Sequence, residues 1–444
     1  MLAVITDCAV PTPEDLQRPV AWRHGQAVPL AEFQRHVAAV ASRLASAGAA
    51  MINLCDDRYR FLVSYAAAAS VGHTVLLPSS RAEQIVAEVQ AIHSHSYRFD
   101  DALVEAALSE HCPAGGAPLS VPGEQVVMIG FTSGSTGQPK AFPKLWRSML
   151  ASTARNAASI RRELGISADV TPWVVATVPP QHMYGMELSI MLPLIGGTAV
   201  HAGRPLFPAD IARALGEIPA PRVLVSTPIH LRAIVESSQE FPATDLIISA
   251  TAPLDAALAA AVENKLGGRL LEMFGSTETC VFANRRTAHD EEWRLYEGVE
   301  LQSAPDGTLV NAPWFVAPTL LQDLVELRGT DGFIVRGRNT DMIEVAGKRA
   351  SLGDLTRRLL AIEGVKDAVV FQPESEAVAT IRRVAALVVA PGLTASQVQD
   401  LFAPSVDSAF MPRPLLVIDA LPRNELGKLP RENLLKELRR RTGA

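Results

Sequence analysis

The sequence is poor in features that mark several large classes of protein. Lysine and arginine (41) do not exceed aspartate and glutamate (47), and the net charge of −6 gives no basic excess for binding nucleic acid or an anionic membrane. Proline, glycine or histidine interrupts the longest apolar stretches, so we expect no membrane span. Residues 1–10 lack a basic segment followed by an apolar core, which argues against a secretory signal.

Cysteine is also scarce. The four cysteines, Cys8, Cys55, Cys112 and Cys280, are scattered without the spacing of a metal site. We interpret them as free thiols in a reducing compartment, and we expect a cytoplasmic protein.

What the chain does contain is typical of a soluble globular protein with more than one domain. Its 444 residues exceed what one compact core usually holds, and 48% are apolar and 20% charged. Apolar residues recur every three to four positions at Phe33, Val37, Val40 and Leu44, which predicts a helix that stops at Gly48. Short apolar strands and helices then alternate, which predicts an α/β architecture with mostly parallel strands buried on both faces.

The pattern of expected strands and helices changes near residue 338. Beyond it, the stretches "VKDAVVFQPE", "RRVAALVVAP" and "PLLVIDALP" are typical of strands, and "LGDLTRRLLAIEG" and "TASQVQDLFAP" are typical of helices. We therefore expect a large domain over residues 1–338 and a separate α+β domain over residues 339–444.

The stretch "FTSGSTGQPK", residues 131–140, follows the apolar run 126–129, and we expect a helix after it. Gly134, Gly137 and Lys140 form a G-x-x-G-x-x-K pattern with no hydroxyl after the lysine, so the loop is not a Walker loop. Its glycines would still let backbone N–H groups approach phosphate oxygens, so the loop could bind phosphate. The alternative is that it is a surface loop of turn-forming residues without a ligand. Three hydroxyls would add hydrogen-bond donors, those of Ser133, Ser135 and Thr136.

Four further stretches accompany this loop. "MFGSTET" carries Glu278, "LQDLVEL" carries Asp323, "DGFIVRGRNTDMIEVAGKRAS" carries Arg338, and "LPRNELGKLPR" carries Lys428. The five stretches resemble, in the right order, the core motifs of the adenylate-forming superfamily of acyl- and aryl-CoA synthetases, luciferases and peptide-synthetase adenylation domains. The resemblance runs from about residue 20 to the end. It implies a large N-terminal domain of mostly parallel sheets layered with helices and a small mobile C-terminal domain.

The resemblance also implies a reaction. A carboxylate attacks the α-phosphate of ATP and expels pyrophosphate, and because both reactants are anionic, positioned cations and donors should supply most of the rate. The loop Thr132–Lys140 would hold the β- and γ-phosphates, and Glu278 would hold Mg²⁺. Lys428 would reach the α-phosphate and the acid from the small domain when that domain closes.

The resemblance assigns the remaining nucleotide contacts as well. Thr277 would donate to the α-phosphate, Phe274 would cover the adenine, and Asp323 would accept from the ribose with Arg338 beside it. The other residues that it places around the nucleotide are Thr132, Ser133, Gly134, Ser135, Thr136, Gly137, Lys140, Ala250, Thr251, Gly275 and Ser276.

Several of these residues have an alternative structural reading. Glu278 could be a solvated acid favoured by a helix dipole, and Lys428 a surface lysine. Asp323 could be a turn residue, because glutamine precedes it where the family usually has glycine.

The stretch "VPPQHMYGMELS" resembles the start of the family's acid pocket, and His182 would lie near the substrate carboxylate, although a lone histidine is usually structural. Amino-acid-activating relatives have an F-D pattern where this chain has Tyr184-Gly185. An amino-acid substrate would leave its ammonium unpaired, so we expect an acid without an α-amine. In "SATAPL", Ala250 and Thr251 replace two glycines of the family, which narrows the pocket and favours an aromatic or small acyl group.

A second step is expected, in which a pantetheine thiol attacks the adenylate and AMP leaves. The family's hinge residue is Asp or Lys, whereas this chain has Thr340 followed by Asp341. Glu344 stands where many relatives have lysine, and Gly347 keeps the small residue that lets the thiol arm approach. These departures leave the hinge and the thiol carrier open.

The expected function is thus that of an ATP-dependent acid–thiol ligase that forms an acyl-adenylate. The segment before the loop is brief, and we find no basic cluster to dock free CoA, so a phosphopantetheine carrier protein is an alternative acceptor. Compact stand-alone ligases that load aryl acids onto acyl carrier proteins look similar. Two alternatives to the ligase remain, an enzyme that passes the adenylate to another nucleophile and a non-catalytic nucleotide- or acyl-binding sensor.

Overall fold

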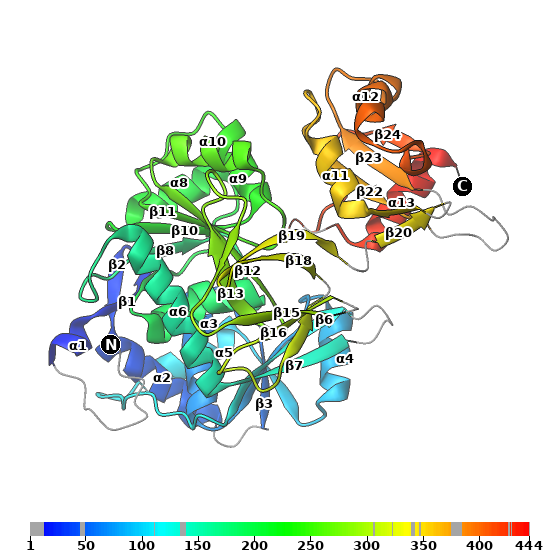
Figure 1. The fold of residues 1–444 in the computed structure, drawn as a ribbon. Coiled ribbons are helices and arrows are strands. Elements are labelled where there is room, and N and C mark those ends of the chain that lie inside the picture. Colours follow the sequence, from blue (N-terminus) through cyan, green and yellow to red (C-terminus); the bar gives the residue numbers. More distant parts are fainter. Residues whose placement is uncertain are drawn as a thin grey trace. The chain divides into compact units, whose positions relative to one another are not determined.

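The fold was analysed in a computed structural model (Figure 1). It describes residues 13–44, 49–110, 112–133, 139–304, 307–321, 323–338, 342–345, 348–373, 384–424, 427 and 429–443. The chain forms two compact units, one of residues 1–299 and 312–317 and the other of residues 300–311 and 318–444. The functional boundary expected after residue 338 stays a prediction.

The larger unit contains a sheet whose six central strands run parallel. In spatial order these are β12 (Arg269–Ser276), β11 (Leu246–Ser249), β10 (Arg222–Ser226), β8 (Trp173–Ala176), β9 (Ala199–His201) and β1 (Pro19–Arg23). Antiparallel strands extend it at both edges, namely β13 (Cys280–Arg285), β14 (Trp293–Leu295) and β2 (Gln26–Pro29). All four residues of β8 and of β11 are buried, so both faces of the sheet are covered, as the sequence predicted.

Helices cover this sheet on its two faces. On one face, α8 (Pro208–Glu217), α9 (Pro228–Glu236) and α10 (Ala256–Leu266) lie together near β10 and β11 (Figure 1) and pack a continuous apolar core against alternate strand residues. Two more helices, α6 (Trp146–Leu164) and the π-helical segment η1 (Glu187–Gly196), contact each other and the strands. The short helix α7 (Met183–Met186) contacts η1 and β13, and α1 (Pro13–Gln17) comes directly before β1 in the chain.

A second sheet of the larger unit has the order β5 (Ser96–Phe99), β3 (Ala50–Asn53), β4 (Thr74–Leu77), β6 (Val126–Ser133) and β7 (Pro139–Leu145). Its first four strands are parallel. Its helices are α2 (Leu30–Leu44), α3 (Arg58–Ser70), α4 (Glu83–Ile92) and α5 (Asp101–Glu110). The helix predicted from the spacing of Phe33, Val37, Val40 and Leu44 is confirmed as α2, and all four side chains are buried.

The helix expected directly after the phosphate loop is wrong in its position. Pro139–Leu145 first forms strand β7, which pairs antiparallel with β6 through Thr132 opposite Lys140. Without β7, one side of β6 would be left with unpaired backbone groups, and this long-range pairing outweighs the local pattern. The helix α6 begins at Trp146, whose side chain is fully buried.

The smaller unit is of the α+β type predicted for the C-terminal region. Its strands are β15 (Glu300–Ala304), β16 (Gly307–Asn311), β17 (Thr319–Leu321), β18 (Asp323–Arg328), β19 (Gly332–Arg338), β20 (Met342–Val345), β21 (Lys348–Ser351), β22 (Asp367–Phe371), β23 (Ala385–Val389) and β24 (Leu415–Val417). Its helices are α11 (Leu352–Leu360), α12 (Ala395–Phe402), α13 (Arg431–Thr442) and the 3-10 turns Ala403–Ser405 and Ser408–Phe410. It has apolar cores of its own around β22 and β23.

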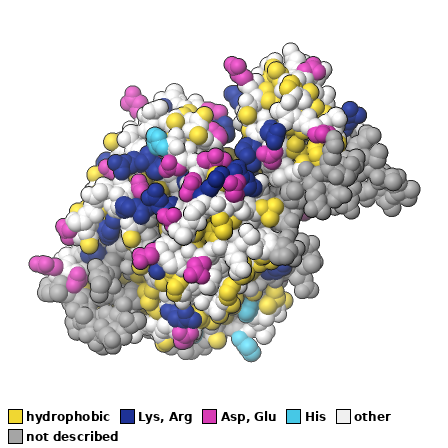
Figure 2. Space-filling view, in the orientation of Figure 1, with side chains coloured by type: hydrophobic (Ala, Val, Ile, Leu, Met, Phe, Trp, Pro, Cys, Tyr) yellow, Lys and Arg dark blue, Asp and Glu magenta, His cyan; other side chains and the backbone are white. Residues whose placement is uncertain are grey.

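The surface agrees with the composition. On the larger unit in Figure 2, basic and acidic side chains adjoin one another across the visible face. In the part of the chain that the structure describes, no helix has both the length and the apolar character needed to cross a membrane.

Candidate active site

A small pocket lies where several strands of the larger unit reach their carboxyl ends. Ligand sites of α/β proteins form at such edges, because the loops that leave neighbouring parallel strands meet there. The lining residues come from the segments that follow β4 and β8, from the end of β6, and from the turn between β12 and β13. They are Leu77, Pro78, Ser79, Gly130, Phe131, Gln181, His182, Met183 and Thr277.

The pocket brings the strand before the phosphate loop against the turn that carries Thr277. A Cβ atom on Gly130 would lie 2.8 Å from Cγ2 of Thr277, so only glycine allows this approach without a shift. Thr132 is half-buried and Lys140 is exposed on the paired strand. Only the backbone of Ser133 is described, and Gly134, Ser135, Thr136 and Gly137 lie outside the described residues.

The turn itself, residues 276–280, is tightly braced. The backbone N–H of Ser276 donates to Oγ1 of Thr279 over 3.1 Å, and the N–H of Thr279 donates back to Oγ of Ser276 over 3.3 Å. A Cβ on Gly275 would lie 2.2 Å from the carbonyl oxygen of Cys280, which explains the glycine of the "FGSTET" stretch. Thr277 and Glu278, at the tip of the turn, remain half-buried.

Phe274 belongs to an aromatic cluster just before this turn. Its ring centroid lies 5.4 Å from that of Phe282 in an edge-to-face arrangement and 5.0 Å from that of Trp293. Such packing fixes the ring while leaving it half-buried. Its role as a cover for adenine stays a prediction.

His182 immediately precedes α7 and lines the pocket. The backbone N–H of His182 donates to the carbonyl of Pro179 over 3.3 Å. A Cβ on Gly185 would lie 2.0 Å from that same carbonyl oxygen, which gives the motif its glycine three residues after the histidine. The motif therefore fixes the backbone that holds the imidazole at the pocket.

Tyr184 ties the same short helix to two strand ends. Its hydroxyl lies 3.1 Å from the carbonyl oxygen of Ser226 and 3.0 Å from that of Ile248, and it can donate to either. Burial raises the pKa of this phenol, so it stays protonated. In the F-D pattern of amino-acid-activating relatives, Tyr184 stands in place of the phenylalanine and Gly185 in place of the aspartate, so this position carries no carboxylate.

The segment after β11 holds an unusual backbone conformation. Thr251 has a φ of 81°, in the left-handed region that favours glycine. Its Oγ1 is buried and has no hydrogen-bond partner among the described residues, and Ala250 beside it is buried. Thr251 thus holds a conformation that favours glycine, at a position where the sequence resemblance places a glycine.

Two predicted ribose contacts lie in the smaller unit. Asp323 on β18 stands opposite Arg338 on β19, and the carbonyl of Asp323 accepts from Oγ1 of Thr308 over 2.8 Å. The side chain of Arg338 is not described. Lys428, Thr340, Asp341 and Gly347 lie outside the described residues, as does the side chain of Glu344.

Sequence reasoning missed a buried charged network behind the turn. Lys144 of β7 is 7% exposed and its Nζ donates to the carbonyl oxygen of Glu278 over 2.5 Å. Glu187 of η1 is 2% exposed, and its carboxylate accepts from the N–H of Val281 over 3.0 Å, from Ser152 and from Asn156. The usable signal was a lone charge within an apolar run, as in "MYGMELSIMLPLIG".

Burial dominates the titration behaviour of this network. It raises the pKa of Glu187, although the donated hydrogen bonds and the charge of Lys144 oppose that effect. It also raises the pKa of the Cys280 thiol to about 12, so this cysteine is a neutral packing residue with a left-handed φ of 62°.

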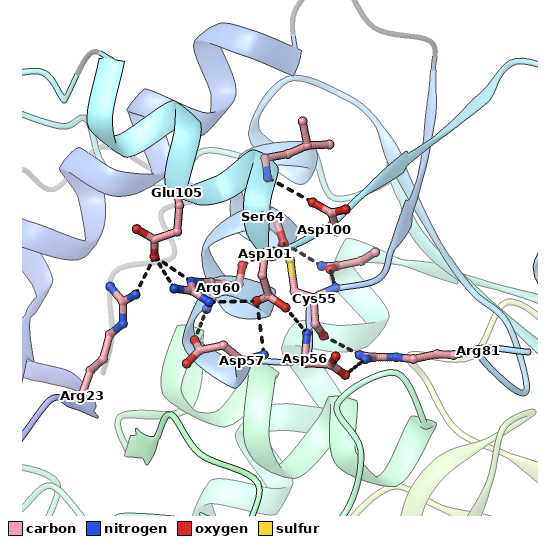
Figure 3. A network of polar contacts seen from close by, with 12 residues as sticks. Arg23, Cys55, Asp56, Asp57, Arg60, Ser64, Arg81, Asp100, Asp101 and Glu105 are labelled. Atoms are coloured by element: carbon pink, nitrogen blue, oxygen red, sulfur yellow. Dashed lines mark hydrogen bonds and ion pairs between the residues drawn. The ribbon is translucent and has the colours of Figure 1, made fainter.

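A second polar network anchors the loop that forms another wall of the pocket (Figure 3). Arg81 donates to the carboxylate of Asp56 and to the carbonyl of Cys55, close to the lining residues Leu77 to Ser79. The N–H groups of Asp56 and Asp57 in turn donate to the carboxylate of Asp101 over 2.7 and 3.3 Å. The loop is therefore tied to the starts of α3 and α5.

Glu105 of α5 extends this network to β1. One of its carboxylate oxygens accepts from Arg23 over 2.7 Å and from Arg60 over 2.7 Å. Desolvation by itself would raise the pKa of Glu105, but the two arginines outweigh it and hold that pKa below its usual range.

The carboxylate of Glu278 suits a magnesium ion. The structure records no hydrogen bond or ion pair of this carboxylate with any described residue. The described residues also contain no cluster of three or more histidine, cysteine, aspartate or glutamate side chains able to hold a metal by themselves. Magnesium does not need such a cluster, because it is commonly bound by one or two protein carboxylates together with phosphate oxygens and water. The residues therefore fit a metal that arrives with a nucleotide.

A two-unit α/β protein in which the strand before the "FTSGSTGQPK" stretch, Thr277 and His182 line one pocket fits the architecture of adenylate-forming enzymes. The chain belongs to the AMP-binding enzyme family, whose family model matches residues 45–302.

The comparisons give several relatives. A 4-coumarate–CoA ligase of Rhodobacter capsulatus is 31% identical over 56% of this chain and 61% of its own length. A second one, of Halorhodospira halophila, is 29% identical over 67% of this chain and 73% of its own. A 3,4-dihydroxybenzoate–[aryl-carrier protein] ligase of Bacillus anthracis is 22% identical over 70% of this chain and 74% of its own. This chain thus spans about three fifths of the length of the first of them.

Solved structures share the fold. The o-succinylbenzoate CoA synthetase of Bacillus subtilis, in complex with its acyl-adenylate intermediate, superimposes with a TM-score of 0.78 at 18% identity, over 94% of this chain and 95% of its own. ATP-bound MatB of Rhodopseudomonas palustris gives a TM-score of 0.77 at 18% identity, over 97% and 98%. The predicted fold class is confirmed by these likenesses.

Proposed function

We propose that the protein is an ATP-dependent acid–thiol ligase. It activates a carboxylic acid as an acyl-adenylate with release of pyrophosphate, then transfers the acyl group to a pantetheine thiol with release of AMP. The observation that carries the proposal is the meeting of Gly130, Thr277 and His182 around one pocket at the strand ends. Membership of the AMP-binding enzyme family supports it.

Each group has a task in this reaction. The phosphate loop and Lys140 hold the β- and γ-phosphates, and Thr277 donates to the α-phosphate on which negative charge develops. A magnesium ion held by Glu278 would neutralise phosphate charge when the nucleotide is bound. His182 lies at the pocket edge, where it would orient the acid carboxylate, and Lys428 would complete the site from the C-terminal domain, residues 339–444.

The remaining predicted residues bind the nucleoside. Phe274 covers the adenine, and Asp323 with Arg338 holds the ribose. Ala250 and Thr251 separate the adenine from the acid.

We further propose an aromatic acid without an α-amine as the substrate. Gly185 offers no carboxylate for an ammonium group where amino-acid-activating relatives have aspartate, and the hydroxyl of the neighbouring Tyr184 is engaged by strand carbonyls. The relatives named above include ligases of 4-coumarate and 3,4-dihydroxybenzoate, which are aryl acids. Either CoA or a carrier protein would supply the thiol, as the names of these relatives include both. The three free cysteines among the described residues fit a reducing, cytoplasmic location.

The test is pyrophosphate exchange with a panel of aryl, aliphatic and amino acids, with ATP and Mg²⁺. We expect exchange with an aryl acid and none with amino acids. Thioester formation is then measured with CoA and with a holo carrier protein. Exchange without thioester on either acceptor would favour the adenylate-only alternative. Nucleotide binding without exchange for any acid would refute the ligase and leave the sensor.

A further inference from the structure

One buried cation has no task in the mechanism above. Lys144 is 7% exposed, and burying an ammonium group is unfavourable unless hydrogen bonds and an opposite charge compensate. Its Nζ donates to the backbone carbonyl of Glu278, the proposed magnesium ligand. The buried ammonium group of Lys144 therefore contacts the backbone of the residue that we propose to bind magnesium.

Glu187, which is also buried, is an acidic residue that interacts electrostatically with Lys144. Its two carboxylate oxygens accept from the N–H of Val281 over 3.1 and 3.0 Å. Lys144 and Glu187 thus hold the turn at two points three residues apart, one at a carbonyl oxygen and one at an N–H group.

The strand that carries Lys144 also belongs to the phosphate-loop hairpin. On that hairpin Met128 pairs with Lys144, and Gly130 packs against Thr277. The hairpin therefore meets the turn twice, at Thr277 through a side-chain contact and at Glu278 through a hydrogen bond. A fixed carbonyl fixes its peptide plane, and that plane contains the Cα atom from which the Glu278 side chain leaves the backbone.

We propose that Lys144 is a positioning residue that, through the Glu278 carbonyl, sets where the Glu278 carboxylate meets magnesium and nucleotide, with Glu187 as the charge that keeps the ammonium inside. The proposal rests on the proposed function. Groups that orient a metal ligand typically change metal affinity by roughly 10- to 100-fold when they are removed.

The test compares Lys144→Met with Lys144→Arg, which keeps charge and donors, and with Glu272→Gln as a matched control. Glu272 is 3% exposed and pairs with Arg285 and Thr287 on the same β12–β13 hairpin, away from the turn. We measure the Mg²⁺ concentration for half-maximal pyrophosphate exchange and, separately, the rise in melting temperature that ATP gives with and without Mg²⁺.

For Lys144→Met we expect a half-saturating Mg²⁺ concentration raised roughly tenfold or more and a reduced Mg²⁺-dependent part of the ATP-induced melting shift. The shift in EDTA should match the wild type, Lys144→Arg should restore most of the Mg²⁺ response, and Glu272→Gln should lower the melting temperature only. A Lys144→Met protein that behaves like Glu272→Gln would overturn the proposal.

If Lys144→Met does not fold, Glu187→Gln carries the test, because losing the counter-charge loosens Lys144 and should also raise the Mg²⁺ requirement. An unchanged Mg²⁺ requirement there would refute the proposal equally. A wild type without exchange for any acid would sink the proposed function instead, whereas the melting shifts would still report on Lys144.

Discussion

Replacing Gly130 with alanine should impair adenylation far more than stability. The new Cβ would meet Cγ2 of Thr277 at 2.8 Å, well inside normal contact, so the turn or the strand must move by several tenths of an ångström. The backbone tolerates alanine, because Gly130 is not among the glycines with a positive φ. Overpacking costs about 1–3 kcal/mol, offset by about 0.4–1 kcal/mol because alanine restricts the unfolded chain.

Catalysis should be more sensitive to the same movement. Because a misplacement of about 1 Å can cost roughly 100-fold in rate, we expect exchange to fall by roughly tenfold or more in Gly130→Ala. Urea unfolding should show a loss of at most about 2.6 kcal/mol, the largest overpacking cost less the smallest offset. The two assays together separate a displaced Thr277 from a destabilised protein.

Two further variants make the argument refutable. In Gly216→Ala on α8, a Cβ would meet nothing within 4 Å, so activity should stay unchanged and stability should be equal or slightly higher. In the double variant Gly130→Ala/Thr277→Ser, serine keeps the hydroxyl but lacks the clashing methyl, so exchange should partly recover. Full exchange activity in Gly130→Ala, or no recovery in the double variant, would contradict the reasoning.

The remaining predictions concern other parts of the chain. Lys428→Ala should abolish pyrophosphate exchange yet leave thioester formation from preformed adenylate largely intact; equal loss of both would contradict a role confined to the first step. Gly185→Ala puts a Cβ 2.0 Å from a backbone carbonyl and should destabilise by about 3 kcal/mol, measured by urea unfolding. Tyr184→Phe removes the hydroxyl that donates to one of two buried carbonyls and should cost about 1–2 kcal/mol with little change in the KM for ATP. Glu105→Gln should cost about 0.5–1 kcal/mol at pH 7, because this half-exposed pair is screened by solvent. Since the folded-state pKa of Glu105 is depressed, that difference should shrink as the pH falls below about 4.3, and a pH-independent difference would contradict the ion pair.

The local patterns predicted much of the fold. Helix α2 could be predicted because it buries one face, which gives apolar residues every three to four positions. Strands β8, β10 and β11 could be predicted because they are buried on both faces, which gives continuous apolar runs. Strand β7 carried no such signal. Its "PKAFPKL" sequence becomes a strand only because β6 offers unpaired backbone groups beside it.

The site, like the fold, was predicted from the sequence only in part. Motifs pointed to His182, Thr277 and Glu278 individually, and the structure brings His182 and Thr277 to one pocket. The apolar run around Glu187 indicates that its charge is buried, but the contacts of Lys144 and Glu187 could not be predicted, because their partners lie 134 and 94 residues away along the chain. No local pattern distinguishes such a lysine from a solvated one, so buried ionic contacts have to be read from tertiary structure.

The accessibility of the thiols bears on how the protein should be probed chemically. Of the three cysteines that the structure describes, Cys55 and Cys280 are buried and Cys112 is exposed. Burial raises the pKa of both buried thiols to about 12, which leaves almost no reactive thiolate near neutrality. An alkylating reagent or maleimide dye should therefore modify Cys112 before either of them. Once Cys8, which lies outside the described residues, is replaced, Cys112 is a suitable attachment point for a fluorophore in a protein that keeps its native Cys280.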